Sequence, residues 1–376
     1  MYALIALYSL LFFWKFWKNP YLNHTSEIGT TFFPHWIWTG RKLRSGSLPF
    51  KDNLYYKYPA CIPFLSTFYP PHWISAFIGS FLPLNNAFRL HTYLILSHYI
   101  FGSCLAYHLF SRWCSPEVAL FGSITLFYSA YSVKLQQPCI SYTMAWIPGI
   151  FLPGWLGVLS MTMALCGGYY PILIYLLPFV LVVHTKTVLL GALFALPQLI
   201  PFLIYFKQSV RWGEKVPVET GRLSLIALGR LFLPIRSRTH VSGVMFMESE
   251  MYMSLLPFLF IWFSSSRFWY VLAFGVAVSV GWLRSWQRIP ARTLYIVTLS
   301  ITILATDGLG KLGLPALSVQ MICLLQAVLL LFNRDIYPCF PFTQWWTKPE
   351  DKNQDYTGYL SEEKLHEYRG AFSLKY

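Results

Sequence analysis

The chain has 376 residues, of which 56% are hydrophobic and only 12% are charged, and its formal net charge is +14. Soluble domains carry charge on about a quarter of their residues. Here the charges fall in gaps between apolar runs of helix length, so the composition excludes an ordinary soluble protein and predicts one polytopic, all-α integral membrane bundle. The cations are scattered among these runs, which argues against nucleic-acid binding, and the seven cysteines show neither a CxxC pair nor metal-ligand spacing.

The chain begins with an apolar run over residues 1–17. We predict an uncleaved membrane span there, because the run lacks a basic n-region and a small-residue cleavage site. A long polar loop follows over residues 18–88. Near its end Trp73, Phe77 and Phe81 recur every four residues, which predicts a short amphipathic helix at the membrane interface.

The rest of the chain is predicted to consist mainly of membrane spans. Pro148, Pro153 and Gly154 interrupt the run 142–165, which indicates two short spans or a re-entrant hairpin. The other apolar runs are 90–110, 118–133, 172–183, 188–206, 251–263, 269–283, 294–305 and 314–332.

These runs predict one transmembrane domain of about eleven spans over residues 1–332. It is interrupted by a second large basic loop at 207–250 and followed by a short polar tail at 333–376. The cations in the loops have two interpretations. They could anchor the loops at anionic headgroups, worth about 1 kcal/mol for each Lys or Arg near the surface, or they could line a basic cavity for an anionic lipid-linked substrate.

Several short motifs occur in a fixed order along the chain. They are Glu27 with Pro34, the run 45–50, Lys57-Tyr58-Pro59, Tyr69-Pro70, Ala145-Trp146-Ile147-Pro148, Gly167-Gly168 with Pro171, the run 195–201 with Ser209 and Arg211, the run 248–257, and Arg288 and Arg292 with Leu304, Ala305 and Gly308. Together they resemble the motifs of the YfhO-like bacterial membrane protein family, which belongs with the GT-C type glycosyltransferases. The chain departs from that pattern at Glu27, where the family generally has Asp, and at Lys51-Asp52, where it has Trp-Asn. It also has Lys57 and Ser254 where the family has Gly, and the turn at 167–171 lacks the family's His.

The resemblance implies a GT-C-like bundle in the bacterial inner membrane, with loop 18–88 as its long first extracytoplasmic loop. The tail would be the stub of an extracytoplasmic domain. The implied activity is transfer of a sugar from a polyprenyl-phosphate donor to an envelope glycan or glycolipid acceptor. The positive-inside rule opposes this orientation, because it would place the basic loops in the cytoplasm.

Glycosyl transfer of this kind needs a carboxylate that orients or deprotonates the acceptor hydroxyl. By the resemblance, Glu27 would take that role, and the competing interpretation is a solvated acid near a helix start. Asp52 is a second candidate, for the acceptor or for a divalent cation, which is the one cofactor we consider; it also fits a turn residue.

Fixed cations are needed to hold the phosphate leaving group as its charge develops. The candidate phosphate ligands are Arg41, Lys42, Arg44, Lys51, Lys57, Arg211, Arg288 and Arg292. Surface solvation or snorkelling to the headgroups is the alternative for these cations. His91, His98 and His108 lack compact metal spacing and are predicted to be polar contacts within the bundle.

Two other function classes stay open. A transporter or flippase for an anionic lipid or solute predicts paired broken helices in two related halves. A non-catalytic membrane scaffold predicts that a Glu27→Gln variant preserves every envelope glycan.

Overall fold

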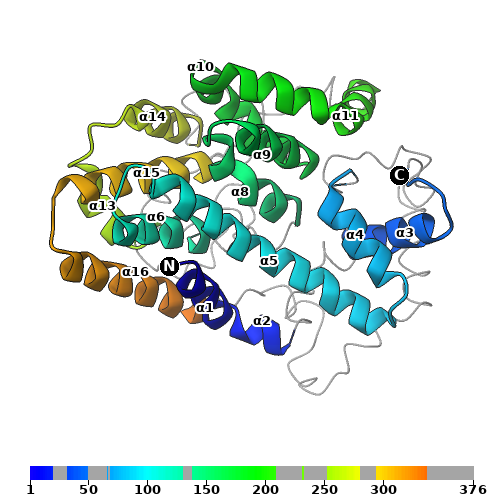
Figure 1. Cartoon of the computed structure of the whole chain (residues 1–376), viewed down its shortest axis with the longest axis horizontal. Coiled ribbons are helices and arrows are strands. Elements are labelled where there is room, and N and C mark those ends of the chain that lie inside the picture. The colour runs from blue at the N-terminus through cyan, green and yellow to red at the C-terminus, as the bar shows by residue number, and fades with distance from the viewer. Residues whose placement is uncertain are drawn as a thin grey trace.

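The structure is a computed structural model, and it describes residues 1–19, 32–49, 66, 68–129, 138–208, 231–232, 252–279 and 294–336. All regular elements in those residues are helices, which confirms the predicted all-α class (Figure 1). The helices are α1 (Tyr2–Phe12), α2 (Trp14–Lys18), α3 (Phe33–Arg44), α4 (Pro70–Gly79), α5 (Leu84–Phe110), α6 (Pro116–Tyr128), α8 (Pro138–Ile150), α9 (Trp155–Cys166), α10 (Tyr170–Phe194), α11 (Leu196–Gln208), α13 (Leu256–Ile261), α14 (Phe268–Ser279), α15 (Leu294–Lys311) and α16 (Ala316–Ile336).

Proline opens several of these helices. Pro34, Pro70, Pro116 and Pro257 each lie in the first turn of a helix. Proline suits this position because its missing N–H would have no intrahelical partner there. The start of α6 is also capped by Ser115, whose hydroxyl accepts a hydrogen bond from the backbone N–H of Val118.

Helix α5 organises the bundle. It has 27 residues, so it is about 40 Å long at 1.5 Å per residue. Figure 1 shows it crossing the molecule from α4 at one end to α6 at the other. Helices α1, α4, α6 and α8 pack directly against it.

Some predicted boundaries differ from the structure. The break predicted within 142–165 is confirmed, because α8 ends at Ile150 and α9 begins at Trp155. The predicted boundary at His184 is instead a kink inside α10, with φ −136° and ψ 47° at that residue. A change of direction of 73° lies between His184–Phe194 and Leu196–Leu203.

The helices of the described residues support a membrane assignment only in part. By length and apolarity, α5 alone could cross a membrane, and the bent pair at α10 and α11 could supply a second crossing. A core helix of a soluble protein passes the same test. Helices α1, α9 and α14 have only 11 or 12 residues, about 18 Å against a hydrocarbon core of about 30 Å. The predicted count of about eleven full spans is therefore not established by these helices.

The polar side chains in the interior of the bundle are not of the charged Lys, Arg, Asp or Glu types in the described residues. Every buried polar side chain in the described residues is Ser, Thr, His or Gln, and none is a Lys, Arg, Asp or Glu. Gln326 of α16 illustrates the pattern: its amide nitrogen donates to the Thr125 hydroxyl at 3.2 Å and to the Met253 carbonyl at 3.0 Å, while its oxygen accepts from Ser254. Neutral hydrogen-bonding groups therefore join helices that are far apart in sequence.

Candidate functional site

Ser66, Phe68 and Tyr69 of loop 18–88 lie just before α4 and pack against the bundle. Ser66 and Tyr69 are buried, and Phe68 is partly buried. We call these three residues the re-entry segment. The Ser66 hydroxyl donates to the carbonyl of Gly167, in the turn after α9, at 2.7 Å. The backbone N–H of Phe68 donates to the side-chain oxygen of Gln198 on α11 at 3.1 Å. Two distant parts of the chain thus hold this segment in place.

Tyr69 completes the attachment through its hydroxyl, which contacts His98 of α5 and Trp146 of α8. The indole N–H of Trp146 donates to the Tyr69 oxygen at 2.7 Å, and that oxygen lies 2.6 Å from Nε2 of His98. Nδ1 of His98 lies 2.6 Å from the Leu94 carbonyl, so it must carry the proton. Nε2 is therefore an acceptor, and Tyr69 donates to it.

This network is suited to anchoring rather than to acid–base chemistry. Burial raises the pKa of Tyr69 far above its ordinary value, although the hydrogen bond from Trp146 partly opposes that shift. A hydroxyl that stays protonated and is already bonded on both sides is neither a base nor a nucleophile at neutral pH. The Tyr69 network therefore fixes the end of the loop on the bundle.

Two buried polar atoms beside the re-entry segment have no hydrogen-bond partner in the described part of the chain. One is the hydroxyl of Tyr142, whose ring stacks on Tyr69 with centroids 4.9 Å apart and planes at 20°. The other is the amide nitrogen of Gln198. Buried polar groups are normally satisfied, so these atoms mark places where water, a ligand or another part of the chain could bind.

A second group of polar rings joins α3, α4 and α5. His35, His72 and His91 are all buried, and the rings of His35 and His72 lie 5.9 Å apart. Trp36 packs against His91 and donates its indole N–H to Ser75 of α4 at 3.0 Å. No three His, Cys, Asp or Glu side chains in the described residues are arranged to hold a metal ion.

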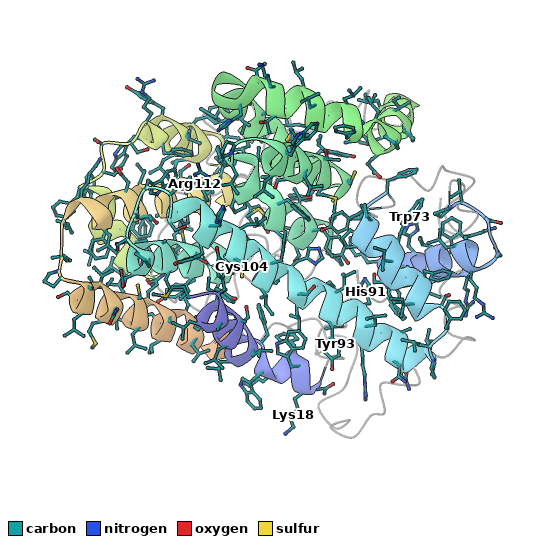
Figure 2. The ribbon with its side chains drawn as sticks, in the orientation of Figure 1. Lys18, Trp73, His91, Tyr93, Cys104 and Arg112 are labelled. Atoms are coloured by element: carbon teal, nitrogen blue, oxygen red, sulfur yellow. The ribbon has the colours of Figure 1, made fainter. Side chains whose placement is uncertain are left out.

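The prediction of a polar contact within the bundle is confirmed for His98, which hydrogen-bonds to Tyr69. His91 is buried against the rings of Phe33 and Trp36, and its Nδ1 has no hydrogen-bond partner in the described residues. His108 is partly exposed. His91 lies in the first third of α5, and Figure 2 shows it on the part of that helix next to α4. The sequence patterns did not predict that Tyr69 is the partner of His98. They also did not predict that Gln198, a buried amide between Pro197 and Pro201 in an apolar run, bonds to the re-entry segment.

Three of the predicted phosphate ligands are described by the structure: Arg41, Lys42 and Arg44, in the last turn of α3. They lie at the end of the α3–α4 pair that is distant from Tyr69. Arg44 donates to the carbonyl of Ser80 at 3.0 Å, and its guanidinium lies 5.1 Å from the ring centroid of Phe81. Tyr69 precedes α4 and Ser80 follows it, so the ten residues of α4 separate them by about 15 Å. The structure therefore does not bring Arg44 to the re-entry segment.

The remaining predicted site residues lie outside the described residues, and their roles stay predictions. They are Glu27, Lys51, Asp52, Lys57, Arg211, Arg288 and Arg292.

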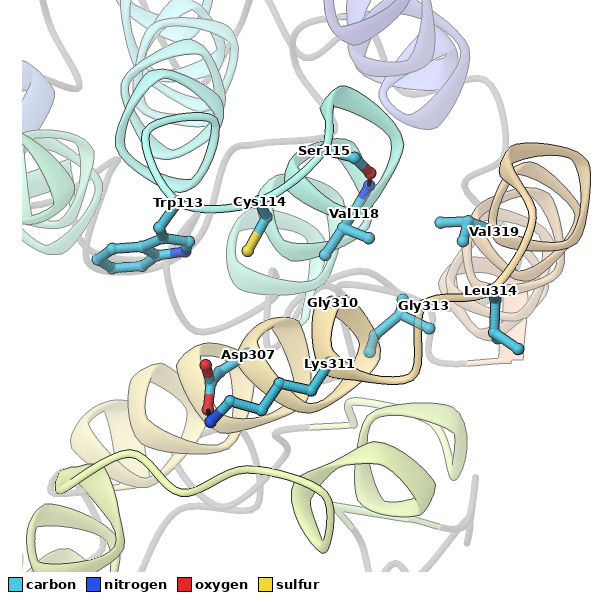
Figure 3. A pocket seen from close by; sticks show the side chains of 11 residues that line it. Trp113, Cys114, Ser115, Val118, Asp307, Gly310, Lys311, Gly313, Leu314 and Val319 are labelled. Atoms are coloured by element: carbon cyan, nitrogen blue, oxygen red, sulfur yellow. Dashed lines mark hydrogen bonds and ion pairs between the residues drawn. The ribbon is translucent and has the colours of Figure 1, made fainter.

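A cavity of about 410 Å³ opens at the opposite end of α5 (Figure 3). It lies between the turn after α5, which carries Trp113 and Cys114, and the end of α15. Asp307 and Lys311 form an ion pair of 2.8 Å on its wall, and Ser264 donates to Asp307 at 2.6 Å. The carboxylate is thus already neutralised by its neighbours.

Comparison with models of protein families, with curated proteins and with solved structures finds no match to the chain. The resemblance to the YfhO-like family is therefore one of short motifs alone.

Four of those motifs meet at the re-entry segment. Tyr69-Pro70 is part of it, and Trp146, Gly167 and Gln198 each belong to one of the others and hydrogen-bond to it. They come from four parts of the chain separated by tens of residues.

Proposed function

We propose that the chain is a multi-pass membrane protein of the bacterial inner membrane that transfers a sugar from a polyprenyl-phosphate donor to an envelope glycan or glycolipid. The observation that carries the proposal is the meeting of four family-like motifs at Ser66, Phe68 and Tyr69. Motifs that arose by chance in an apolar chain would have no reason to share one hydrogen-bonded position in space.

The outer surface supports the membrane part of the proposal. Several helices expose rows of large apolar side chains at helical spacing. On α1 these include Leu4, Leu7 and Leu11, and on α16 they include Leu317, Met321, Leu324 and Leu325. Soluble monomers rarely expose contiguous apolar patches beyond a few hundred Å². An apolar exterior around an interior bonded through Ser, Thr, His and Gln is typical of helices packed within lipid.

Helix lengths are also compatible with this placement. Helices α15 and α16 have 18 and 21 residues, or about 27 to 32 Å. These lengths are close to the roughly 30 Å of a hydrocarbon core.

The proposed chemistry assigns roles to residues of loop 18–88 and to Arg288. The Glu27 carboxylate accepts the proton of the acceptor hydroxyl while the acceptor oxygen bonds to the anomeric carbon. The bond from that carbon to the phosphate oxygen breaks, and polyprenyl phosphate leaves with the electron pair. Basic side chains such as Lys51, Lys57 and Arg288 stabilise the leaving charge. The re-entry segment supports this scheme because its hydrogen bonds tie this part of the loop to α5, α8, α11 and the turn after α9.

The test compares envelope glycans in cells that carry wild-type protein, Glu27→Gln or Glu117→Gln, at equal protein levels. Glu117 is a matched control in the first turn of α6, next to the opposite end of α5. We expect Glu27→Gln to lose one glycan or glycolipid and Glu117→Gln to retain it. A Glu27→Gln strain with every glycan intact would instead support a scaffold.

A second candidate function is translocation of an anionic lipid or solute. Two chain breaks favour it: the interruption over 151–154 between α8 and α9, and the 73° bend next to Ala195. Transporter sites are commonly built from broken helices. Wild-type protein in proteoliposomes that moves a polyprenyl-phosphate lipid across the bilayer without sugar transfer would support this alternative.

A further inference from the structure

Helix α4 presents an apolar face to the outside of the molecule. The side chains of this face are 43% to 64% exposed: Ile74, Phe77 and Ile78 on the helix, and Phe81 just after its end. The opposite face is buried and small, with Ala76 and Gly79 packed against α3. The exposed face therefore has no covering element in the described part of the chain, although the helix itself is firmly packed.

The last turn of α3 is basic, and Arg44 of that turn lies at the edge of the apolar face of α4. Arg41, Lys42 and Arg44 occupy the last turn of α3, which packs against α4. The contacts of Arg44 with the Ser80 carbonyl and the Phe81 ring hold its guanidinium beside the exposed aromatic side chains. An arginine held in this way can offer its remaining N–H donors to a phosphate.

The two stretches that form this surface contain no acidic residue. Neither 32–49 nor 68–83 contains an Asp or Glu, so no carboxylate of these two stretches neutralises Arg44. The surface also lies where α4 turns into α5, the helix with the length to span a membrane. Aromatic side chains flanked by cations at the end of such a helix match the boundary between lipid tails and anionic headgroups.

From this geometry we infer that the α3–α4 pair is a binding surface for anionic phospholipid, in which Phe77 and Phe81 contact the acyl region and Arg44 contacts the headgroup phosphate. This inference rests on the membrane placement and is independent of the proposed sugar transfer. It also gives Arg44 a partner other than the donor phosphate, from which Arg44 is separated by the length of α4 if the donor binds near Tyr69.

The experiment uses the full chain in detergent micelles, titrated with short-chain phosphatidylglycerol, with phosphatidylcholine of the same chains, or with inorganic phosphate. The rise in Tm with ligand concentration gives an apparent affinity, since a ligand that binds the native state stabilises it. We expect phosphatidylglycerol to bind at least tenfold more tightly than phosphatidylcholine. We expect Arg44→Gln to reduce that affinity about fivefold, the effect of one surface cation.

The matched control is Arg112→Gln, which removes an exposed arginine at the other end of α5 (Figure 2). It should leave the affinity for phosphatidylglycerol unchanged. Equal binding of the two lipids, an unchanged affinity in Arg44→Gln, or equal stabilisation by inorganic phosphate would overturn the inference. If Arg44→Gln does not fold, a photo-crosslinking residue at Phe77 decides the question: cross-links to phospholipid support the surface, and cross-links only to protein overturn it.

Discussion

At the scale of single residues, the structure separates two stacked tyrosines with different roles. Tyr69 donates to His98 and accepts from Trp146. The hydroxyl of Tyr142, on the neighbouring ring, has no such partner in the described residues. Removing a hydroxyl that hydrogen-bonds to two buried groups lowers the stability of the fold, because both groups lose their partner. Removing a hydroxyl without a partner has little effect on stability.

We predict that Tyr69→Phe lowers the free energy of unfolding by about 2–4 kcal/mol, because it leaves His98 Nε2 and the Trp146 N–H buried without partners. Tyr142→Phe should change it by less than about 0.5 kcal/mol. Chemical unfolding of the purified protein in micelles measures both. Equal losses in the two variants would contradict the hydrogen-bond assignment.

A second prediction concerns pH and His72. Burial lowers the pKa of His72 well below its ordinary value, and the neighbouring His35 and His91 lower it further. Below about pH 6.5 the unfolded chain therefore binds a proton that the folded protein does not, so stability falls as the pH falls, by up to about 1.4 kcal/mol per pH unit.

Between pH 6.5 and pH 5, we expect His72→Gln to reduce the dependence of the free energy of unfolding on pH by the contribution of about one proton. Unfolding curves at several pH values measure it, with Lys311→Gln as a control far from the histidines. A slope that is the same in wild type and in His72→Gln would show that His72 is not the group responsible.

At the scale of elements, the α3–α4 pair shows what the sequence could and could not predict. The outward apolar side chains of α4 follow from the spacing of Phe77 and Phe81, as expected. Helix α3 was not foreseen, because its residues lie inside a loop defined by its charge. Its formation depends on tertiary contacts: Trp36 packs over Gly79 and bonds to Ser75, and neither contact can be inferred from local pattern.

We predict that Gly40→Val separates this pair. A Cβ at Gly40 would overlap the backbone carbonyl of Ala76 on α4, which cannot move without shifting the helix. Overpacking of this kind costs about 1–3 kcal/mol or more, which thermal unfolding would record as a lower Tm.

Gly310→Ala is the matched control for that substitution. The nearest atom to a Cβ at Gly310, on α15, is 3.5 Å away. Alanine should therefore be tolerated or stabilise the helix by about 0.5–1 kcal/mol. A Gly40→Val variant as stable as Gly310→Ala would rule out the close approach of α3 and α4.

At the scale of the whole molecule, composition predicts the helical class correctly, and the structure confirms it. Apolar runs locate most helices, but they do not establish how many of them cross a membrane, because a run of apolar residues can fold as two short helices, as 142–165 does. The motif order predicts which parts of the chain matter, but not that Tyr69, Trp146, Gly167 and Gln198 meet. That meeting follows from helix packing over long sequence separations, which no local pattern encodes.

The central claim is that the bundle spans a membrane, with loop 18–88 and the α3–α4 pair on its outer side. The most direct test places single cysteines at Leu82 and Arg112, which flank the two ends of α5, in a variant whose seven native cysteines are replaced. A membrane-impermeant maleimide is then applied to intact cells and to opened membranes. The account predicts labelling of Leu82→Cys in intact cells, and of Arg112→Cys only after the membranes are opened. Labelling of both sites in intact cells, or the reverse pattern, would contradict it.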